Sequence, residues 1–413
     1  MLPEGWELKE LQFLCKKIAV GLAISVTPFM RASGAKLIRN QNIKRNYFNS
    51  NSVVYIDEVF ADSNKSKRVR HGDVVAVRTG SNIGEACVVP EEFDGALTFT
   101  TLIARPNPDF LDSFYLSTHI NSDRGVAEVN RLCAGGGKPN LNSGELKRYR
   151  LLTPPLPEQK KIAQILSTWD KAITTTEQLL VNSQQQKKAL MQQLLTGKKR
   201  LLDENGVRFS GEWKEINLGK SVKVIGGNAF KSEEFKECGI PVVRISNIKP
   251  DYSINMDSSI FVSEDSRFNR FKIINGDILI AMSGATTGKI GMYNLNTFSY
   301  LNQRVGKFEP IKGRASKNYL FQLFKQPKIQ YNVLIDAVGG AQPNISNKDI
   351  ERIKVLIPAL SEQQKIAAVL STADQEITVL QQKLHILKLE KKALMQQLLT
   401  GKRRVIVDKE AVA

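Results

Sequence analysis

The chain has few residues of the kinds that build metal centres or disulfide frameworks. Its 413 residues include four cysteines and three histidines, and no two cysteines form a CxxC pair. A structural zinc site needs closely spaced Cys or His ligands, and a disulfide scaffold needs many regularly spaced cysteines. We therefore expect no bound metal and reduced thiols, as in a cytoplasmic protein.

Long apolar runs are missing as well. No segment reaches the roughly 18 to 20 consecutive apolar residues of a membrane-spanning helix. The first ten residues, MLPEGWELKE, lack the apolar core of a signal peptide. The sequence therefore predicts a soluble, cytoplasmic protein. Its hydrophobic content of 42% is sufficient for more than one buried core.

Motifs of common nucleotide-dependent enzymes are also missing. There is no N/D-P-P-Y segment for methylation of a base amino group and no GxGxxG segment after a strand. Residues Gly284–Ile290 approach a P-loop, but the segment is one residue short and ends in Ile where Ser or Thr would bind magnesium. We expect a protein without an active site of its own.

Positive charge is abundant. The chain has 59 Lys and Arg against 41 Asp and Glu, a formal net charge of +18. Such a charge attracts polyanions over long range, which favours a nucleic-acid partner. An anionic membrane surface or simple solubility could also explain the charge.

One long segment occurs twice in the chain, 204 residues apart. Residues Glu158–Arg200 align with Glu362–Arg404 without a gap, and 26 of the 43 aligned positions are identical. The run KKALMQQLLTGK is complete in both copies. Because this period exceeds the roughly 20 to 50 residues of solenoid repeats, each repeat is a domain-sized unit with its own helix.

The regions that precede the two helical segments share a backbone skeleton but few other residues. The shared positions are Gly72 with Gly276, Gly80 with Gly284, Gly84 with Gly288, Pro106 with Pro310 and Pro139 with Pro343. Gly and Pro set a backbone path, whereas the side chains around them can change. The sequence thus predicts two heads with one mixed α/β (α+β) fold and different contact surfaces.

Each repeated segment is expected to form one helix of about 38 residues, roughly 57 Å long. The segment Ser361-Glu362-Gln363-Gln364 fits a capping box, and Gly197 and Gly401 suit left-handed C-caps. Apolar residues recur in heptads, and because one helix with a single apolar seam is unstable alone, the two copies should pack together. The predicted seam residues are Leu166, Trp169, Ile173, Leu180, Leu190, Leu194, Leu370, Ile377, Leu380, Leu384, Leu387, Leu394 and Leu398, and the seam is interrupted by Thr176, Ser183, Lys187 and Lys391.

These features divide the chain into six predicted segments. They are a first head (1–153), a first helix (154–197), a linker (198–211), a second head (212–357), a second helix (358–401) and a C-terminal tail (402–413).

The chain resembles the DNA-specificity subunits of Type I restriction-modification systems. The resemblance rests on PPLPEQKKIAQILSTWDKAI with KKALMQQLLTGKKRL, followed by a second head and then PALSEQQKIAAVLSTADQEI with KKALMQQLLTGKRR. It covers the whole chain in the order head, helix, head, helix.

The resemblance implies that each head is a target-recognition domain that reads one half of a split, asymmetric DNA sequence. It implies that the two helices pack antiparallel as a coiled-coil spacer and dock two methyltransferase subunits, which modify an adenine in each half-site. Restriction subunits would join this core to translocate and cleave foreign DNA. S-adenosylmethionine, ATP and Mg would bind to those partners and not to this chain. Two alternatives remain open: a stand-alone DNA-binding regulator with a coiled-coil spacer, and an enzyme with an unrecognised catalytic motif.

Polar loop residues on the shared skeleton are the candidates for contact with bases, because loops on a rigid scaffold can change side chains without loss of the fold. Arg and Lys can bind guanine, and Asn and Gln can pair with adenine. In the first head the candidates are Arg39, Asn40, Gln41, Asn42, Arg78, Thr79, Ser81, Asn82, Lys138 and Asn140. In the second head they are Arg244, Ser246, Asn247, Ser283, Thr286, Thr287, Lys289, Asn302, Gln303, Arg304, Gln342 and Asn344. For any one of them, ordinary solvated loop polarity is the alternative interpretation.

Overall fold

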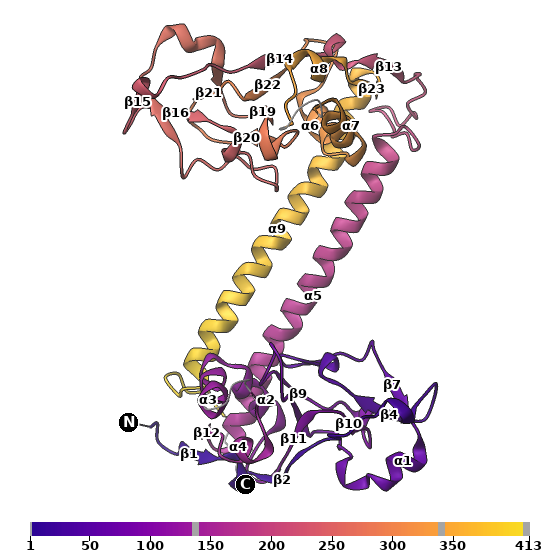
Figure 1. Ribbon diagram of the computed structural model, residues 1–413, viewed down its shortest axis with the longest axis vertical. Coiled ribbons are helices and arrows are strands. Elements are labelled where there is room, and N and C mark those ends of the chain that lie inside the picture. Colours follow the sequence, from indigo (N-terminus) through magenta and orange to yellow (C-terminus); the bar gives the residue numbers. More distant parts are fainter. Residues whose placement is uncertain (1, 134–139, 338–342, 408–413) are drawn as a thin grey trace. The chain divides into compact units, whose positions relative to one another are not determined.

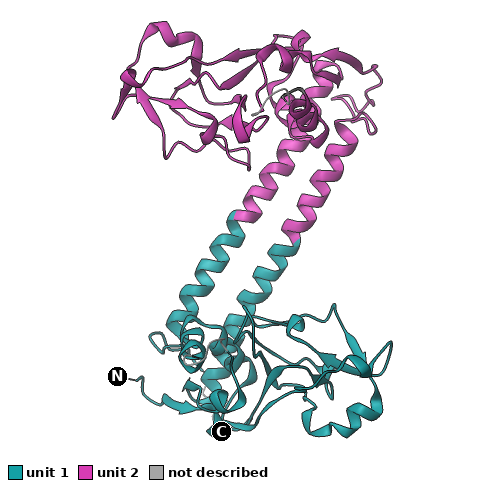
Figure 2. Ribbon diagram, in the orientation of Figure 1, with its two compact units in different colours: residues 1–178, 382–413 teal, residues 179–381 magenta. Residues whose placement is uncertain are grey.

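The computed structural model describes residues 2–133, 140–337 and 343–407 (Figure 1). The chain forms two compact units: one comprises residues 1–178 and 382–413, the other residues 179–381 (Figure 2). Each unit holds one head, part of one long helix and part of the other. The six consecutive segments expected from the sequence are therefore combined differently, because each head packs against both helices.

The first head is built on a four-stranded antiparallel sheet in the order β2-β11-β8-β9. These strands are β2 (Cys15–Val20), β11 (Thr101–Pro106), β8 (Val74–Val77) and β9 (Ala86–Val88). A smaller sheet has the order β10-β4-β7-β3, with β10 (Leu97–Thr98), β4 (Ala35–Ile38), β7 (Val54–Ile56) and β3 (Met30–Arg31). Two further pairs are β1 (Glu7–Glu10) with β12 (Arg150–Thr153) and β5 (Ile43–Lys44) with β6 (Tyr47–Phe48). The helices of the head are α1 (Glu58–Ser63), α2 (Ser113–Asn121), α3 (Asp123–Cys133) and α4 (Ser143–Lys147).

Strand β8 is apolar throughout because both of its faces are buried. Val74 and Ala76 pack in the core that contains α2, whereas Val75 and Val77 pack in a second core on the opposite face. Successive side chains of a strand point to opposite faces, so the two cores lie on either side of the sheet.

The second head repeats this plan. Its main sheet has the order β14-β22-β19-β20, with β14 (Val222–Gly226), β22 (Val305–Pro310), β19 (Asp277–Ala281) and β20 (Ile290–Tyr293). A five-stranded sheet contains β15 (Phe235–Lys236), β17 (Ile260–Val262), β16 (Ile240–Val243), β21 (Ser299–Leu301) and β18 (Lys272–Ile273). The remaining elements are β13 (Lys214–Asn217) paired with β23 (Lys354–Ile357), and α6 (Lys317–Phe324), α7 (Pro327–Ala337) and α8 (Asn347–Arg352). The prediction of two heads with one mixed helix and sheet fold is confirmed.

The repeated segments form two helices of 39 residues each, α5 (Leu156–Leu194) and α9 (Leu360–Leu398). Gly197 and Gly401 follow them with φ of 72° and 71°, the left-handed conformation predicted for the C-caps. The capping box predicted at Ser361 is wrong, because α9 begins at Leu360 and Ser361 lies inside it. The Glu362 carboxylate accepts hydrogen bonds from the Arg200 side chain.

Residues of α5 and α9 pack against each other in antiparallel order within each unit. All of the predicted seam residues are buried or half-buried. The polar positions that interrupt the seam also make contacts between the helices: Ser183 donates to Glu376 at 2.9 Å, and Lys187 forms an ion pair with Asp374. In the other unit, Lys391 pairs with Asp170. Ser183, Lys187 and Lys391 thus link the two helices, whereas the Thr176 hydroxyl donates to the Ala172 carbonyl of its own helix at 2.7 Å.

Within the described ranges, no helix has an apolar stretch long enough to cross a membrane. The same residues contain no cluster of His, Cys, Asp and Glu side chains that could hold a metal ion. The four cysteines are free thiols, and Cys87 is buried whereas Cys238 is exposed.

Candidate nucleic-acid interface

Two of the predicted residue sets meet in the first head. The loop after β8 lies against the chain segment that precedes α4, where Thr79 and Asn140 form an isolated antiparallel bridge. The backbone N–H of Leu141 donates to the Arg78 carbonyl at 3.0 Å. The Arg78 Nε atom donates to the Asn140 side-chain oxygen at 3.1 Å. Residues 62 positions apart in sequence therefore form one polar surface.

The second head brings together the equivalent segments. Ser283 and Asn344 form the same kind of antiparallel bridge. The Gly284 N–H donates to the Pro343 carbonyl at 3.0 Å, and the Ile345 N–H donates to the Met282 carbonyl at 2.9 Å. The backbone of this loop pair is therefore common to both heads.

A third set of predicted residues joins this surface beside the second sheet of each head. In the second head the Asn302 N–H donates to the Val243 carbonyl at 3.1 Å, and the Met282 N–H donates to the Arg304 carbonyl at 2.9 Å. Residues 302–304 thus connect the turn that contains Arg244 with the loop that follows β19. In the first head, the Phe99 N–H donates to the Ile38 carbonyl at 2.8 Å in the corresponding place.

The glycines of the loops explain why their backbone is the same in both heads. Gly84 and Gly288 both have φ of 82°, which favours glycine over other residues. A Cβ atom on Gly84 would lie 2.9 Å from Val129 of α3, and one on Gly288 would lie 3.2 Å from Val333 of α7. Each loop is therefore held against a helix, and its other side chains are free to differ.

Most of the predicted readers reach the surface of their head. Those that are exposed are Gln41, Thr79, Ser81, Asn82, Asn140, Ser246, Gln303, Arg304 and Asn344. Those that are half-buried are Arg39, Asn40, Arg78, Arg244, Ser283, Thr286, Lys289 and Asn302. Lys138 and Gln342 lie outside the described residues.

Three predicted readers are corrected by the structure. Asn42 is fully buried, and its side chain bonds to the backbone of Arg39 and Asn49 at 2.9 and 2.8 Å. Asn247 makes the equivalent bonds in the second head. The Thr287 hydroxyl donates to the carbonyls of Gly284 and Pro343. These three side chains hold turns together and are not available to a base.

Unpaired polar atoms are concentrated on this surface. In the part of the chain that the structure describes, ten buried side-chain N or O atoms have no hydrogen-bond partner, and five of them belong to predicted readers. These five are the Arg39 Nε, Asn40 Oδ1, Arg244 Nε, Ser283 Oγ and Thr286 Oγ1 atoms. A buried polar atom without a partner is costly, and its missing bond is supplied by ordered water or by a ligand.

Two further residues on this surface were not among the predicted readers. Asn228 bridges to Asn302, and its carbonyl accepts from the Gln303 N–H at 2.8 Å. Thr100 has φ of 53°, an unfavourable conformation for a β-branched residue and one that is enriched at functional sites. The Gly226-Gly227 pair was an available sequence signal for the turn before Asn228, whereas nothing in the sequence indicated Thr100.

Comparisons with known proteins agree with this organisation. The Type I restriction modification DNA specificity domain matches residues 3–182 and 210–389. The Type I restriction enzyme MjaVIII specificity subunit of Methanocaldococcus jannaschii is 28% identical over 355 residues, which cover 83% of this chain and 82% of that protein. The EcoKI specificity subunit of Escherichia coli is 23% identical, with 88% of this chain and 81% of that protein covered. The crystal structure of a Type I restriction-modification S subunit from M. genitalium has a similar fold, with a TM-score of 0.62, 18% identity, and 95% and 96% coverage of the two chains.

Proposed function

The chain belongs to the Type I restriction-modification DNA specificity family, and we propose that the polar loops of its two heads read the two halves of one DNA target. The chain is a sequence-specific DNA-binding subunit and not an enzyme, and each head reads one half of a bipartite, asymmetric site. No observation favours a stand-alone regulator. What remains to be assigned is which side chains read the bases and how the partner subunits are held.

One observation carries the assignment of the readers. The two heads place the same backbone segments together at one end of the main sheet, but the side chains on those segments differ. A shared scaffold with different donors and acceptors is what two readers of different sequences require. The unpaired polar atoms at these positions support the same assignment.

In the first head, Arg78 is the proposed guanine reader. Its Nε atom is held by Asn140, which orients the guanidinium group, and the terminal nitrogens can donate to guanine O6 and N7. The exposed amides of Gln41 and Asn82 have the donor and acceptor pair that adenine requires.

In the second head the proposed readers have different chemistry. Arg304 and Lys289 are the candidates for guanine, and Gln303 is the candidate for adenine. The hydroxyls of Ser283 and Thr286 have unpaired oxygen atoms and can both donate and accept.

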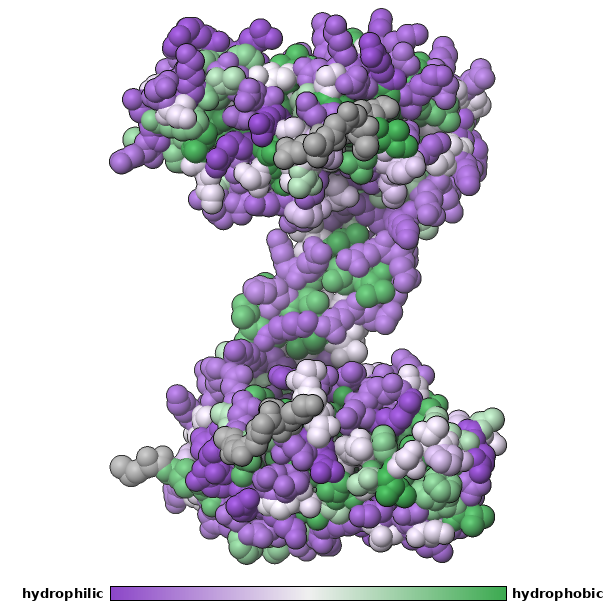
Figure 3. All heavy atoms as spheres, in the orientation of Figure 1, coloured by the Kyte–Doolittle hydropathy of each residue, from purple (hydrophilic) through white to green (hydrophobic). Residues whose placement is uncertain are grey.

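The repeated helices support docking of two copies of the modification subunit. In the run KKALMQQLLTGK, the exposed residues are identical as well as the buried ones: Lys188 and Gln192 on α5 correspond to Lys392 and Gln396 on α9. On α9, Lys392 and Gln396 also contact the exposed carboxylate of Asp123 at 3.5 and 3.4 Å. The identity of the exposed residues in both copies supports two equal surfaces for one kind of partner. Apolar side chains also reach the surface of the helices (Figure 3). Among them, Ile386 and Leu389 are 52% and 54% exposed.

The remaining parts of the proposal concern the full assembly. Restriction subunits would join the complex of this chain with the modification subunits. S-adenosylmethionine, ATP and Mg would be bound by those partners. The complex would act on foreign DNA in the cytoplasm.

Methylation mapping tests the division of labour between the heads. The chain is co-expressed with its modification subunit, and residues 1–153 are exchanged for the first head of a relative. The methylated motif should change in one half and remain the same in the other. A change in both halves, or methylation without a bipartite motif, would contradict independent readers.

Native mass spectrometry tests the docking surfaces. Lys188→Glu together with Gln192→Glu alters only the copy on α5, so the complex should lose one of two modification subunits. Gln185→Glu is the matched control, because Gln185 is exposed but corresponds to Leu389 in the other copy. Retention of both subunits by the double variant would refute these surfaces.

A further inference from the structure

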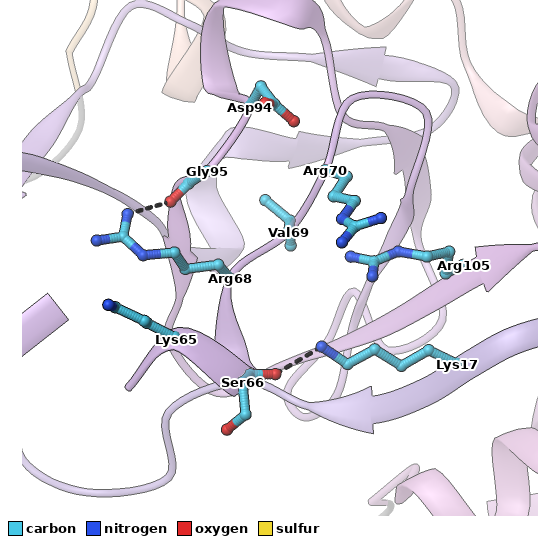
Figure 4. Close-up of a pocket in the computed structure, with 9 residues that line it drawn as sticks. All are labelled: Lys17, Lys65, Ser66, Arg68, Val69, Arg70, Asp94, Gly95 and Arg105. Atoms are coloured by element: carbon cyan, nitrogen blue, oxygen red, sulfur yellow. Dashed lines mark hydrogen bonds between the residues drawn. The ribbon is translucent and has the colours of Figure 1, made fainter. Parts of the chain in front are cut away.

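The first head contains a strongly basic cavity that the reading of bases does not use. Its volume is about 480 Å³, and five cationic side chains and one carboxylate line it (Figure 4). These are Lys17, Lys65, Arg68, Arg70, Arg105 and Asp94. The cavity lies where β8 begins, whereas the Arg78 loop lies where β8 ends. At about 3.3 Å per residue, the chain from Asp73 to Arg78 spans roughly 17 Å.

Backbone carbonyls hold several of these cations in place without neutralising them. Lys17 donates to the Ser66 carbonyl at 2.6 Å, and Arg68 donates to the Gly95 carbonyl at 2.6 Å (Figure 4). Arg68 also pairs with Asp62 at 3.1 Å. Arg105 forms two hydrogen bonds of 2.8 Å with the buried carboxylate of Asp73. Three of the five positive groups are therefore positioned in advance, and within the described part of the chain two of the five have a carboxylate partner.

Arg70 differs from Arg68 and Arg105. Among the described residues, no carboxylate pairs with its guanidinium group, which points toward that of Arg105 (Figure 4). The pKa of Lys17 is lowered, first by burial and then by the charge of Arg105, with a further contribution from Arg70. The cations thus repel one another, and a bound anion would relieve this repulsion.

The second head shows that the fold does not need this arrangement. Its equivalent cavity, of about 350 Å³, is lined by three lysines together with Asp277 and Glu309. By position in the paired strands, Glu309 stands in the place of Arg105, and Ile274 stands in the place of Arg70. Lys317 pairs with Asp277 at 3.0 Å. The guanidinium cluster is therefore specific to the first head.

We propose that the cavity of the first head binds phosphate groups. Guanidinium groups match the geometry of phosphate oxygens, and three of them line this cavity, with those of Arg70 and Arg105 facing each other (Figure 4). The phosphates could come from the DNA backbone beside the target or from a small phosphorylated ligand. Because phosphates are the same at every base pair, DNA held in this cavity contributes affinity without sequence preference.

The variant Arg70→Ile tests the proposal, because isoleucine is the natural residue at the equivalent position of the second head. Lys65→Ala is a second variant that removes an exposed cation of the same cavity. Lys317→Ser is the matched control, because it removes one positive charge from the other cavity and introduces the residue found at Ser113 in the first head. Each variant is assembled with its modification subunits, and its circular dichroism is compared with that of the parent.

Two measurements are made. The first is the affinity for a target duplex and for a duplex without the target, over a range of salt concentrations. The second is thermal stabilisation by inorganic phosphate against chloride at equal ionic strength. If DNA supplies the phosphates, Arg70→Ile weakens binding to both duplexes by the same factor, about 3- to 10-fold, and lowers the salt slope by about 0.9 per lost contact.

If a small ligand supplies the phosphates, DNA affinity stays the same and stabilisation by inorganic phosphate is lost in Arg70→Ile but not in Lys317→Ser. No change in either measurement would overturn the proposal. A loss confined to the target duplex would also overturn it, since Arg70 would then read bases. The inference rests on the DNA-binding role, but its failure is distinct from failure of the proposed readers, because only changes at the readers alter the ratio of target to non-target binding.

Discussion

The ion pair between Glu362 and Arg200 should be among the most important polar contacts of its unit. Glu362 stands in the first turn of α9 and is 1% exposed, and Arg200 follows the end of α5. The carboxylate accepts from Arg200 Nε and Nη2 at 2.6 and 2.7 Å, and from Trp213 Nε1 at 3.2 Å. The contact therefore joins the end of one helix, the start of the other and the base of the head.

We predict that Arg200→Met destabilises this unit by about 3 kcal/mol, the lower end of the range for breaking a buried pair. The variant leaves a buried carboxylate with only the Trp213 N–H as a donor. The cost falls at the lower end because the Arg200 side chain is 20% exposed, so water reaches this side of the site. Adding Glu362→Gln removes the unpaired charge and should recover most of the loss, to within about 1 kcal/mol.

Urea unfolding followed by circular dichroism measures these differences. Lys199→Met is the control, because Lys199 is adjacent in sequence and exposed, and it should change stability by less than about 0.5 kcal/mol. The reasoning is refuted if Arg200→Met is as stable as this control, or if the double variant is no more stable than Arg200→Met alone. In the other unit, Arg404→Met should repeat the result, since Glu158 accepts from Arg404 and Trp6 in the same way.

Three further predictions concern single side chains. Arg78→Ala should weaken binding of the cognate duplex by about 1 to 3 kcal/mol and relax the base preference at one base pair of the first half-site. Binding to duplexes that carry each single-base change in this half-site measures the preference, and an unchanged preference at every base pair would contradict the role of Arg78. Burial raises the pKa of Asp374, but hydrogen bonds from Gln322, Lys187 and Lys325 outweigh it, so the pKa lies below its ordinary value. The stability from this group is therefore present above the unfolded pKa of about 3.9 and is lost as the pH falls through the folded pKa. Asp374→Asn should therefore flatten the acid end of the curve of unfolding free energy against pH. Parallel curves for the variant and the parent would contradict this. Burial raises the pKa of the Cys87 thiol to about 12. Ellman's reagent at pH 8 should therefore label the exposed Cys238 quickly and Cys87 only after unfolding. Rapid labelling of Cys87 in the folded Cys238→Ser variant would contradict the buried position of Cys87.

Several features of the fold could be predicted from the sequence because local interactions determine them. Gly197 and Gly401 mark the helix ends, since a left-handed residue at that position is favourable mainly for glycine. The heptads of α5 and α9 identified the sides of the helices that are buried. The loops at Gly84 and Gly288 were recognisable as one backbone path, because glycine at both positions permits the same positive φ.

The roles of individual polar side chains required the tertiary structure. The side chains of Asn42 and Thr287 have donors and acceptors that could bind bases, but in the folded chain they donate to nearby backbone carbonyls instead. The basic cavity likewise combines residues from separate segments, which come together only when β2, β8 and β11 pair.

Glu362, near the start of α9, shows most clearly the difference between what the sequence determines and what the tertiary structure decides. By itself the sequence determined that the same helix occurs twice, with the same ends and the same apolar seam, because these signals act within a few residues. It placed Glu362 near the start of the second helix but gave no partner for its carboxylate. Only the tertiary structure gave this carboxylate its partner, Arg200, which lies 162 residues away in the chain. A charge in a buried position takes whichever opposite charge the fold brings within hydrogen-bond distance, and sequence separation places no limit on that choice.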